Sequence, residues 1–391
     1  MFTLSDALFI LGFFVLVLRH RIPLEPLRFF TPFWYAGFAM MVTGLLIGSV
    51  YCPAPERWPI VAGQYLFAYI ILPMIMLRRS EEQTVAMLKA YVWGVFAMNL
   101  FGAIVYFTYT GSFDDARKLF GVDFLSGGRR LGAFTSDANW NGAVLAMAIP
   151  VVFYLRAKER VGDLLALAWL GVLGMGVLLT ASFTAFMGSA AAVLMFMAVG
   201  GIRFRPRTWM MLGAAAVLAI AIFFETGAQL PATFVERVGN AITNQDISEA
   251  GTFEGRMALI REAWGLVEQH LFVGLGADQF RVASIYSAPV HNMYLLLWAE
   301  GGLLAMFGWM LMMAVLLAVG IKSYARDRMA TALTLSTATT FLIATTASPH
   351  MYARLWSVPV VLALAVSIEV VRDPGPAIRR KMVLKRAGAA V

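Results

Sequence analysis

The sequence predicts an all-α, polytopic integral membrane helical bundle of about 11–12 transmembrane helices, with a large extracytoplasmic loop that carries interfacial helices. The chain of 391 residues is 60% hydrophobic and only 14% charged, whereas soluble globular domains are about 25% charged. Its apolar residues also gather in repeated runs close to the roughly 20 residues that span a bilayer. We therefore expect a single transmembrane domain over residues 1–391 rather than several soluble domains.

The apolar runs give the expected helices in chain order. No basic residue precedes the first run, 4–18, and Arg19 and Arg21 follow it. This order predicts a spanning helix rather than a cleaved signal peptide. Further helices are expected at about 33–50, 60–77, 85–107, 141–155, 163–181, 184–201, 208–226, 295–320, 329–347 and 355–371.

Basic residues divide the connections into two groups that alternate along the chain, with twenty Lys and Arg in one group and ten in the other. Cytoplasmic loops are the ones enriched in Lys and Arg. The bias predicts an extracytoplasmic N-terminus and a cytoplasmic C-terminus. The richer group comprises Arg19, Arg21, Arg28, Arg78, Arg79, Arg156, Lys158, Arg160, Arg203, Arg205, Arg207, Lys322, Arg326, Arg328, Arg372, Arg379, Arg380, Lys381, Lys385 and Arg386. The other comprises Arg57, Arg117, Lys118, Arg129, Arg130, Arg237, Arg256, Arg261, Arg281 and Arg354.

Two outer connections, 108–140 and 226–290, are too long to be simple connectors, and such loops usually bind or catalyse. Both are predicted to lie on the extracytoplasmic face. Within the second, residues of about 255–270 have apolar side chains at helical spacing and a charged opposite face. This pattern is typical of an interfacial helix, which either covers the bundle or grips a substrate.

Charge and cysteine content exclude several classes. The net charge of +8 does not indicate a nucleic-acid partner, because the basic residues lie in short loops rather than on one face. Cys52 is the only cysteine, so an internal disulfide is impossible and a Cys-based metal site is not expected. The acidic pair Asp114–Asp115 has no His or Cys at ligand spacing and is interpreted as solvated loop. We expect neither a metal nor a cofactor.

Among the four histidines, His291 and His350 are predicted at outer helix ends, while His20 is cytoplasmic and His270 ends the interfacial helix. His291 precedes an apolar run, so the helix dipole disfavours its protonated form. A neutral imidazole is a suitable general base. A purely structural role, as a helix cap or a lipid headgroup contact, is the alternative.

Outer arginines are the complementary feature, since the guanidinium group suits paired hydrogen bonds to phosphate. The alternative is that they bind ordinary lipid phosphates or pair with Asp123, Asp137 or Glu262. Glu300, inside the helix that follows His291, is an ionisable residue within a span and is expected to line an outer cavity. The candidate arginines are Arg129, Arg130, Arg256, Arg261 and Arg354.

Several motifs resemble the O-antigen ligase and O-antigen polymerase superfamily of bacterial membrane glycosyltransferases. The resembling stretches are Arg129–Phe134, Asp137–Asn139, Gly142, Gly255–Arg256, Phe272–Gly276, His291–Asn292, Glu300 and Gly302. The chain departs from the pattern at Phe183, where the family commonly has an arginine linked to diphosphate binding, and at Ala138 and Ala305. Arg129, Arg130 or Arg354 would then have to supply the missing charge.

The resemblance implies a multi-pass protein of the bacterial inner (cytoplasmic) membrane, with a periplasmic N-terminus and a cytoplasmic C-terminus. It also implies transfer of a glycan from undecaprenyl diphosphate to a sugar hydroxyl at the periplasmic face. His291 would be the general base, and Arg256, Arg129, Arg130, Arg261, Asn292, Arg354 and Glu300 would bind substrate. The acceptor would be a growing glycan or a lipid A core, and the departure at Phe183 favours a polymerase or exopolysaccharide enzyme. Membrane lipids and chain-length regulator or flippase proteins are the implied partners. The alternative function is a transporter or lipid-binding protein of similar fold, although transporters usually place ionisable groups near the bilayer midplane.

Overall fold

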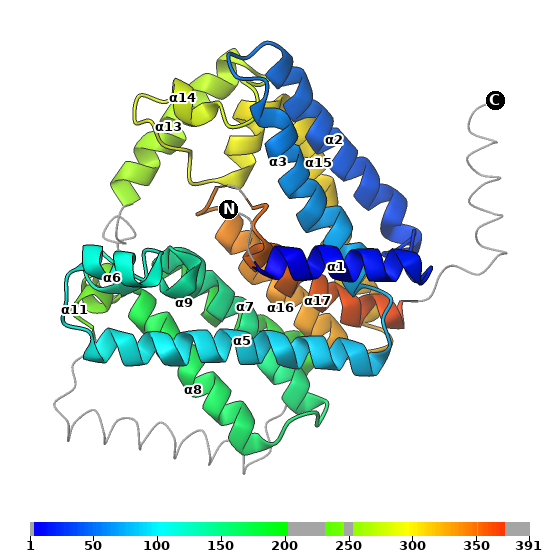
Figure 1. Ribbon diagram of the computed structural model, residues 1–391, viewed down its shortest axis with the longest axis vertical. Coiled ribbons are helices and arrows are strands. Elements are labelled where there is room, and N and C mark those ends of the chain that lie inside the picture. The colour runs from blue at the N-terminus through cyan, green and yellow to red at the C-terminus, as the bar shows by residue number, and fades with distance from the viewer. Residues whose placement is uncertain (1–3, 202–230, 246–252, 350, 372–391) are drawn as a thin grey trace.

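The computed structural model describes residues 4–201, 231–245, 253–349 and 351–371. It confirms the all-α membrane bundle (Figure 1): helices make up most of the described chain, and a two-stranded hairpin, β1 (Leu125–Ser126) and β2 (Arg130–Leu131), interrupts them. Every predicted range coincides with a helix except 208–226, which lies outside the described residues. Within the described residues, 7 helices are long and apolar enough to cross a membrane.

The long helices follow the predicted runs, and shorter helices lie mainly in the connections. The long ones are α1 (Leu4–Leu18), α2 (Thr31–Val50), α3 (Arg57–Leu66), α5 (Glu81–Thr108), α7 (Ala138–Ala157), α8 (Asp163–Thr180), α9 (Phe183–Gly200), α13 (Phe253–Gln269), α15 (Met293–Ser323), α16 (Arg328–Thr345) and α17 (Arg354–Val370). The short ones are η1 (Arg28–Phe30), η2 (Phe67–Ile71), α4 (Leu72–Met76), α6 (Phe113–Phe120), η3 (Ala133–Thr135), α11 (Ala232–Phe234), η4 (Val235–Gly239), α12 (Asn240–Thr243) and α14 (Phe280–Ala283).

Helix α7 forms the centre of the bundle. Of its most apolar stretch 83% is buried, against 28–50% for the other candidate spans, and it packs on α5, α8, α9 and α16. The Asn141 amide donates to Asn99 Oδ1 of α5 at 2.9 Å and to the Leu131 carbonyl of β2. Buried polar groups need such partners, so this amide pair ties the hairpin to two helices.

Small residues bring α2 and α15 into close contact. A Cβ added at Gly44 would lie 2.6 Å from Ala305 N, and one at Gly37 would lie 2.7 Å from Gly308 O. Small residues at this spacing let membrane helices approach closely and gain dispersion energy. The two helices lie side by side in the upper part of the molecule (Figure 1), and Ala305 is small enough to serve where the family has another small residue.

A kink at Gly302 divides α15 and is filled by the preceding loop. Gly302 has φ +66°, which frees backbone groups of the helix. Leu303 N donates to Leu271 O at 3.2 Å, while Leu275 N and Gly276 N donate to the carbonyls of Ala299 and Glu300, each at 2.8 Å. Non-helical backbone at membrane depth is tolerated where protein groups satisfy it in this way.

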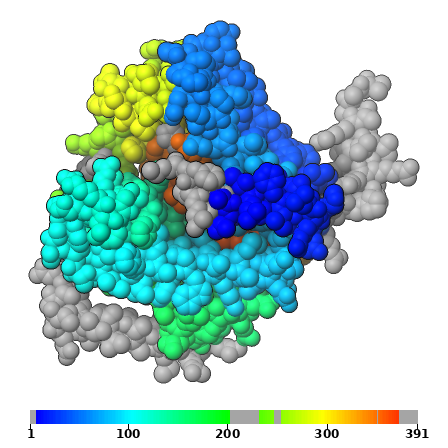
Figure 2. All heavy atoms as spheres, in the orientation of Figure 1, coloured from blue at the N-terminus to red at the C-terminus, as the bar shows by residue number. Residues whose placement is uncertain are grey.

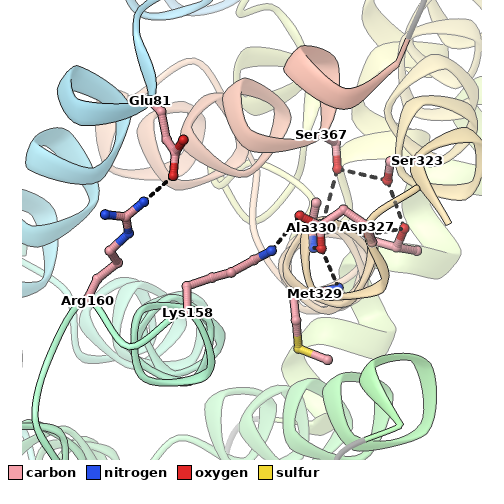
Figure 3. A network of polar contacts seen from close by, with 9 residues as sticks. Glu81, Lys158, Arg160, Ser323, Asp327, Met329, Ala330 and Ser367 are labelled. Atoms are coloured by element: carbon pink, nitrogen blue, oxygen red, sulfur yellow. Dashed lines mark hydrogen bonds and ion pairs between the residues drawn. The ribbon is translucent and has the colours of Figure 1, made fainter. Parts of the chain in front are cut away.

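Ion pairs join the loops of the basic-rich group at one end of the bundle, which we call the basic end. Arg28 and Arg78 both pair with Glu369, Lys158 Nζ lies 2.7 Å from Asp327 Oδ2, and Arg160 pairs with Glu81. Figure 3 shows the last two pairs, together with Asp327 accepting from Met329 N at the start of α16 and Ser367 of α17 donating to the Ala330 carbonyl of α16. These contacts bring the described loops of this group together at one end, while residues 203–207 and 372–386 lie outside the described residues. The opposite end, predicted to be periplasmic, is called the outer end.

Candidate active site

The His291–Asn292 pair begins α15 at the outer end. Asn292 is the N-cap, and its Oδ1 accepts from Tyr294 N at 3.0 Å and Leu295 N at 3.1 Å. Asparagine is among the preferred residues for this role. The cap fixes where the helix starts and so positions His291, which is half-buried directly before it. Asn292 therefore acts on the helix itself rather than projecting toward a ligand.

The hairpin separates the two adjacent arginines. Arg130 lies in β2 opposite Ser126, and its Nε donates to the Thr180 carbonyl at 2.9 Å while Nη2 donates to Asn139 Oδ1 at 2.8 Å. Arg129 has φ +54° and turns the other way, onto the carbonyls of Tyr106 and Tyr109 at the end of α5. Arg129 thus holds the C-terminus of α5, and only Arg130 faces the site.

The helix predicted at about 255–270 is present as α13 (Phe253–Gln269) and covers the bundle. Leu259, Ala263 and Val267 are buried against the bundle, so the helix covers it. Arg256 is half-buried at its N-terminal end, whereas Arg261 is exposed. Five residues along a helix turn a side chain to a different face, so these two arginines do not act together.

Arg237, which we did not predict as a site residue, joins the same region from α11 and η4. Thr233 Oγ1 donates to the Gly128 carbonyl of the hairpin, and the Phe234 ring packs on Phe186 of α9. Arg237 Nε is buried without a hydrogen-bond partner among the described residues. Only its position in the long outer loop distinguished it in the sequence, because no motif surrounds it.

Mutual electrostatic effects define a group that we call the outer cluster: His291, Arg130, Arg237, Arg256 and Asp137. Burial lowers the pKa of His291 below its ordinary value, and the positive charge of Arg256 lowers it further. Burial, followed by the charges of Arg237 and Arg256, lowers the pKa of Arg130 to about 10. Burial and Arg237 likewise lower the pKa of Arg256. Both effects penalise the charged form.

Asp137 is the carboxylate of the outer cluster, and its charge opposes these shifts at Arg130, Arg256 and His291. Its Oδ1 also accepts from Asn139 N at 2.7 Å and Trp140 N at 3.0 Å, which caps α7. Arg256 and Asp137 therefore act on the imidazole of His291, while Arg237 acts on Arg130 and Arg256. Such a surplus of positive charge in a partly buried site suits an anionic ligand.

The remaining predicted residues lie elsewhere. Glu300 is 4% exposed and accepts from Phe280 N at 3.2 Å, so it anchors the loop that fills the α15 kink instead of lining the outer cluster. Arg354 lines a cavity of about 850 Å³ that is mainly apolar and includes Phe67, Val95 and Val358. His350 lies outside the described residues.

The molecular surface is hollowed between the yellow region of α13–α15 and the cyan region of α5 and α6 (Figure 2). Helix α13, which carries Arg256, borders one side of this hollow (Figure 1). The residues of the outer cluster come from the start of α7, from α13, from the start of α15, from the hairpin and from η4, which are far apart in the sequence.

Comparison with known proteins gives one family match. A family model described as O-antigen ligase matches residues 165–310, a range that includes Arg237, Arg256 and His291 of the outer cluster. No curated protein matches the chain at a significant level. The match confirms the resemblance found in the motifs: residues 165–310 are similar to the O-antigen ligase family, and the described part of the chain has several helices apolar enough for a multi-pass membrane protein.

Proposed function

We propose that the protein transfers a glycan from a lipid diphosphate, undecaprenyl diphosphate by family resemblance, to a sugar hydroxyl at the periplasmic face of the inner membrane. The observation that carries the proposal is the outer cluster. Burial and the charge of Arg256 lower the pKa of the half-buried His291, and the charge of Arg237 acts in turn on Arg256 and Arg130. The O-antigen ligase match covers the histidine and two of these arginines.

His291 is the general base of this reaction. A ring nitrogen takes the proton of the acceptor hydroxyl while the hydroxyl oxygen forms a bond to the anomeric carbon of the donor. The bond from that carbon to the diphosphate oxygen breaks, and its electron pair leaves with the diphosphate. A low pKa keeps the imidazole neutral and able to accept the proton. A single displacement inverts the anomeric centre, so a product with retained configuration would contradict this step.

Arg130, Arg237 and Arg256 hold the diphosphate and stabilise the negative charge that it gains on leaving. The arginine that the family commonly carries at the α8–α9 turn is Phe183 in this chain. Arg130 donates to the carbonyl of Thr180 beside this turn. Phe183 itself packs against the cluster of Phe234 and Val238 that flanks Arg237. These contacts support Arg130 and Arg237 as the residues that supply the missing charge.

The lipid chain of the donor needs an apolar surface beside the cluster. The cavity of about 850 Å³ offers one, lined by α1, α3, α5, α7 and α17, and Arg354 is the one charged residue among the described residues that line it. Thr135, whose hydroxyl donates to the Asp137 carbonyl at 3.0 Å, lines the same cavity. This link supports a path from the cavity to the outer cluster.

Purified protein in lipid nanodiscs, incubated with lipid-linked repeat units, tests the proposal. The expected products are longer lipid-linked chains or, with a lipid A core acceptor added, a new conjugate. Their formation should depend on His291 and Arg256 and should persist in EDTA. A transporter or lipid-binding protein would bind the lipid-linked glycan and yield neither product, so binding without products would overturn the proposal.

A further inference from the structure

A second cavity lies at the outer end, outside the outer cluster. It measures about 540 Å³ and is formed by the end of α2 with the turn that follows it, and by the C-terminus of α13 with the loop 271–275. The residues of the turn that line it include Tyr51 and Cys52. Glu300 and the α15 kink lie behind the loop, since Gly276 N bonds the Glu300 carbonyl. The cavity therefore has a firm floor.

Three consecutive polar side chains, Glu268, Gln269 and His270, line this cavity. No hydrogen bond or ion pair within the described part of the chain engages these side chains. Together they offer a carboxylate acceptor, an amide that donates and accepts, and an imidazole with one donor and one acceptor. This set matches a ring of hydroxyl groups, each of which both donates and accepts.

Two exposed aromatic side chains flank the polar row. Tyr51 is 82% exposed and Phe272 is 73% exposed, and both line the cavity. An aromatic ring gives a large apolar face, and tyrosine adds a polar tip. Sugar rings have an apolar C–H face with hydroxyls at the rim, which fits an aromatic wall beside planar polar groups.

Charge separates this cavity from the other two regions described above. Glu268 brings a carboxylate and the lining contains neither Lys nor Arg, so phosphate and anionic lipid headgroups are disfavoured. The apolar cavity beside Arg354 is lined mainly by hydrocarbon, whereas here three polar side chains point to an uncharged polyol.

Helix α13 links this cavity to the reacting groups. Arg256 lies near its first residue and Gln269 is its last, which places the two ends about 20 Å apart at a rise of about 1.5 Å per residue. A glycan chain that reacts at His291 can follow α13 for several sugars before it reaches the cavity. We infer that this cavity is a subsite for a neutral oligosaccharide, which holds the transferred glycan several sugars away from the bond that forms. The inference rests on the proposed function, which makes the glycan the substrate.

Cys52 provides the test, because it is the only cysteine in the sequence and it lines the cavity half-exposed. The full-length protein in nanodiscs is labelled with a maleimide, with and without oligosaccharides released from the lipid-linked glycan by mild acid. At an oligosaccharide concentration about tenfold above Kd, mass action leaves about one site in ten free, so labelling should slow about tenfold. Inorganic phosphate should leave the rate unchanged. An unaffected rate with oligosaccharide, or equal protection by phosphate, would overturn the inference.

Matched variants locate the effect. Tyr51→Ala and Gln269→Ala should lose the protection, whereas Tyr286→Ala should keep it, because Tyr286 is also an exposed outer tyrosine but does not line the cavity. Each labelling rate is compared with the rate of the same variant without oligosaccharide. A change in the basal reactivity of Cys52 therefore does not affect the measured protection. The first two variants should also raise KM for long donors and leave KM for single repeat units unchanged. An equal rise for both donors would contradict a remote subsite.

The same labelling separates this inference from the proposed function. Protection should persist in His291→Ala, in which turnover is expected to be lost. If oligosaccharide protects Cys52 but the unsubstituted protein shows no turnover, the transferase proposal is wrong and the oligosaccharide site is retained. Full turnover without protection would sink only the subsite.

Discussion

The basic end and the outer cluster hold positive charge in different ways. At the basic end, Arg78 pairs with Glu369, Lys158 with Asp327, and Arg160 with Glu81. At the outer cluster, Arg130 instead donates to neutral groups, the Thr180 carbonyl and the Asn139 amide oxygen. Arg130 and Arg256 share the field of one carboxylate, Asp137, and both have lowered pKa values.

This difference separates structural charge from functional charge. Paired charges in short loops help to orient and close a bundle. Like charges brought together in a partly buried region disfavour their own ionised forms. Proteins keep such arrangements mainly where a ligand of opposite sign completes them. The outer cluster is therefore the end of the molecule at which substitutions should affect turnover more than stability.

The largest effect is expected from His291→Ala. Loss of a general base should lower the rate of glycan transfer about 10²–10⁴-fold, measured as product formed from lipid-linked repeat units. His20→Ala is the matched control, because His20 is exposed near the basic end. Full activity of His291→Ala would remove the histidine from the chemistry.

Arg256→Gln should lower the rate about 10²-fold, since removal of one donor that stabilises developing negative charge costs about that much. Arg160→Gln removes the same charge at the basic end and should leave turnover close to that of the unsubstituted protein. Arg261→Gln, which alters an exposed position on the same helix as Arg256, should behave like Arg160→Gln. Equal losses in all three variants would abolish the distinction between the two ends.

The dependence of the transfer rate on pH should change less, but the direction of each change is defined. The active form of His291 is neutral, so activity is lost as pH falls through its pKa, and this acid limb should lie below 6.5. Arg256→Gln removes a charge that lowers the pKa, so the limb should move to higher pH. Asp137→Asn keeps the α7 cap but removes a charge that raises the pKa, so the limb should move to lower pH. Each shift should be a few tenths to about one pH unit, and shifts of the same sign would refute the arrangement.

The smallest effect is expected at the basic end. Lys158→Gln breaks the pair with Asp327, whose side chain also accepts from Met329 N and Ala330 N at the start of α16. Partly exposed pairs contribute about 0–1 kcal/mol, so a thermal-unfolding midpoint should fall slightly while turnover stays constant. A large loss of turnover would show that this end also takes part in the reaction.

Much of the fold follows from local pattern. Apolar runs located the described spanning helices, and the periodicity of 255–270 located α13. The His291–Asn292 motif likewise marked the start of α15, because an N-cap is a local signal. The kink at Gly302 was not predicted, since a glycine inside an apolar run does not reveal that a distant loop will enter the helix there.

The sequence identified the residues of the outer cluster only in part. Arg130 and Arg256 join the outer cluster, whereas Arg129 bonds the end of α5 and Glu300 is buried beneath a loop. Arg129 and Arg130 are adjacent, so the local sequence around them does not distinguish them. The turn at Gly128 directs their side chains to different places. Arg237 was missed because its partners lie on other segments.

The sequence by itself determined that the chain is a membrane bundle, which loops share an end, and that His291 precedes a helix, because hydropathy, charge bias and capping act over a few residues. Only the tertiary structure decided which arginines face that histidine. The reason is physical: the field at His291 depends on Arg256 and Asp137, which α13 and the cap of α7 bring together across long stretches of chain. Such proximity is a property of packing, which no local pattern encodes.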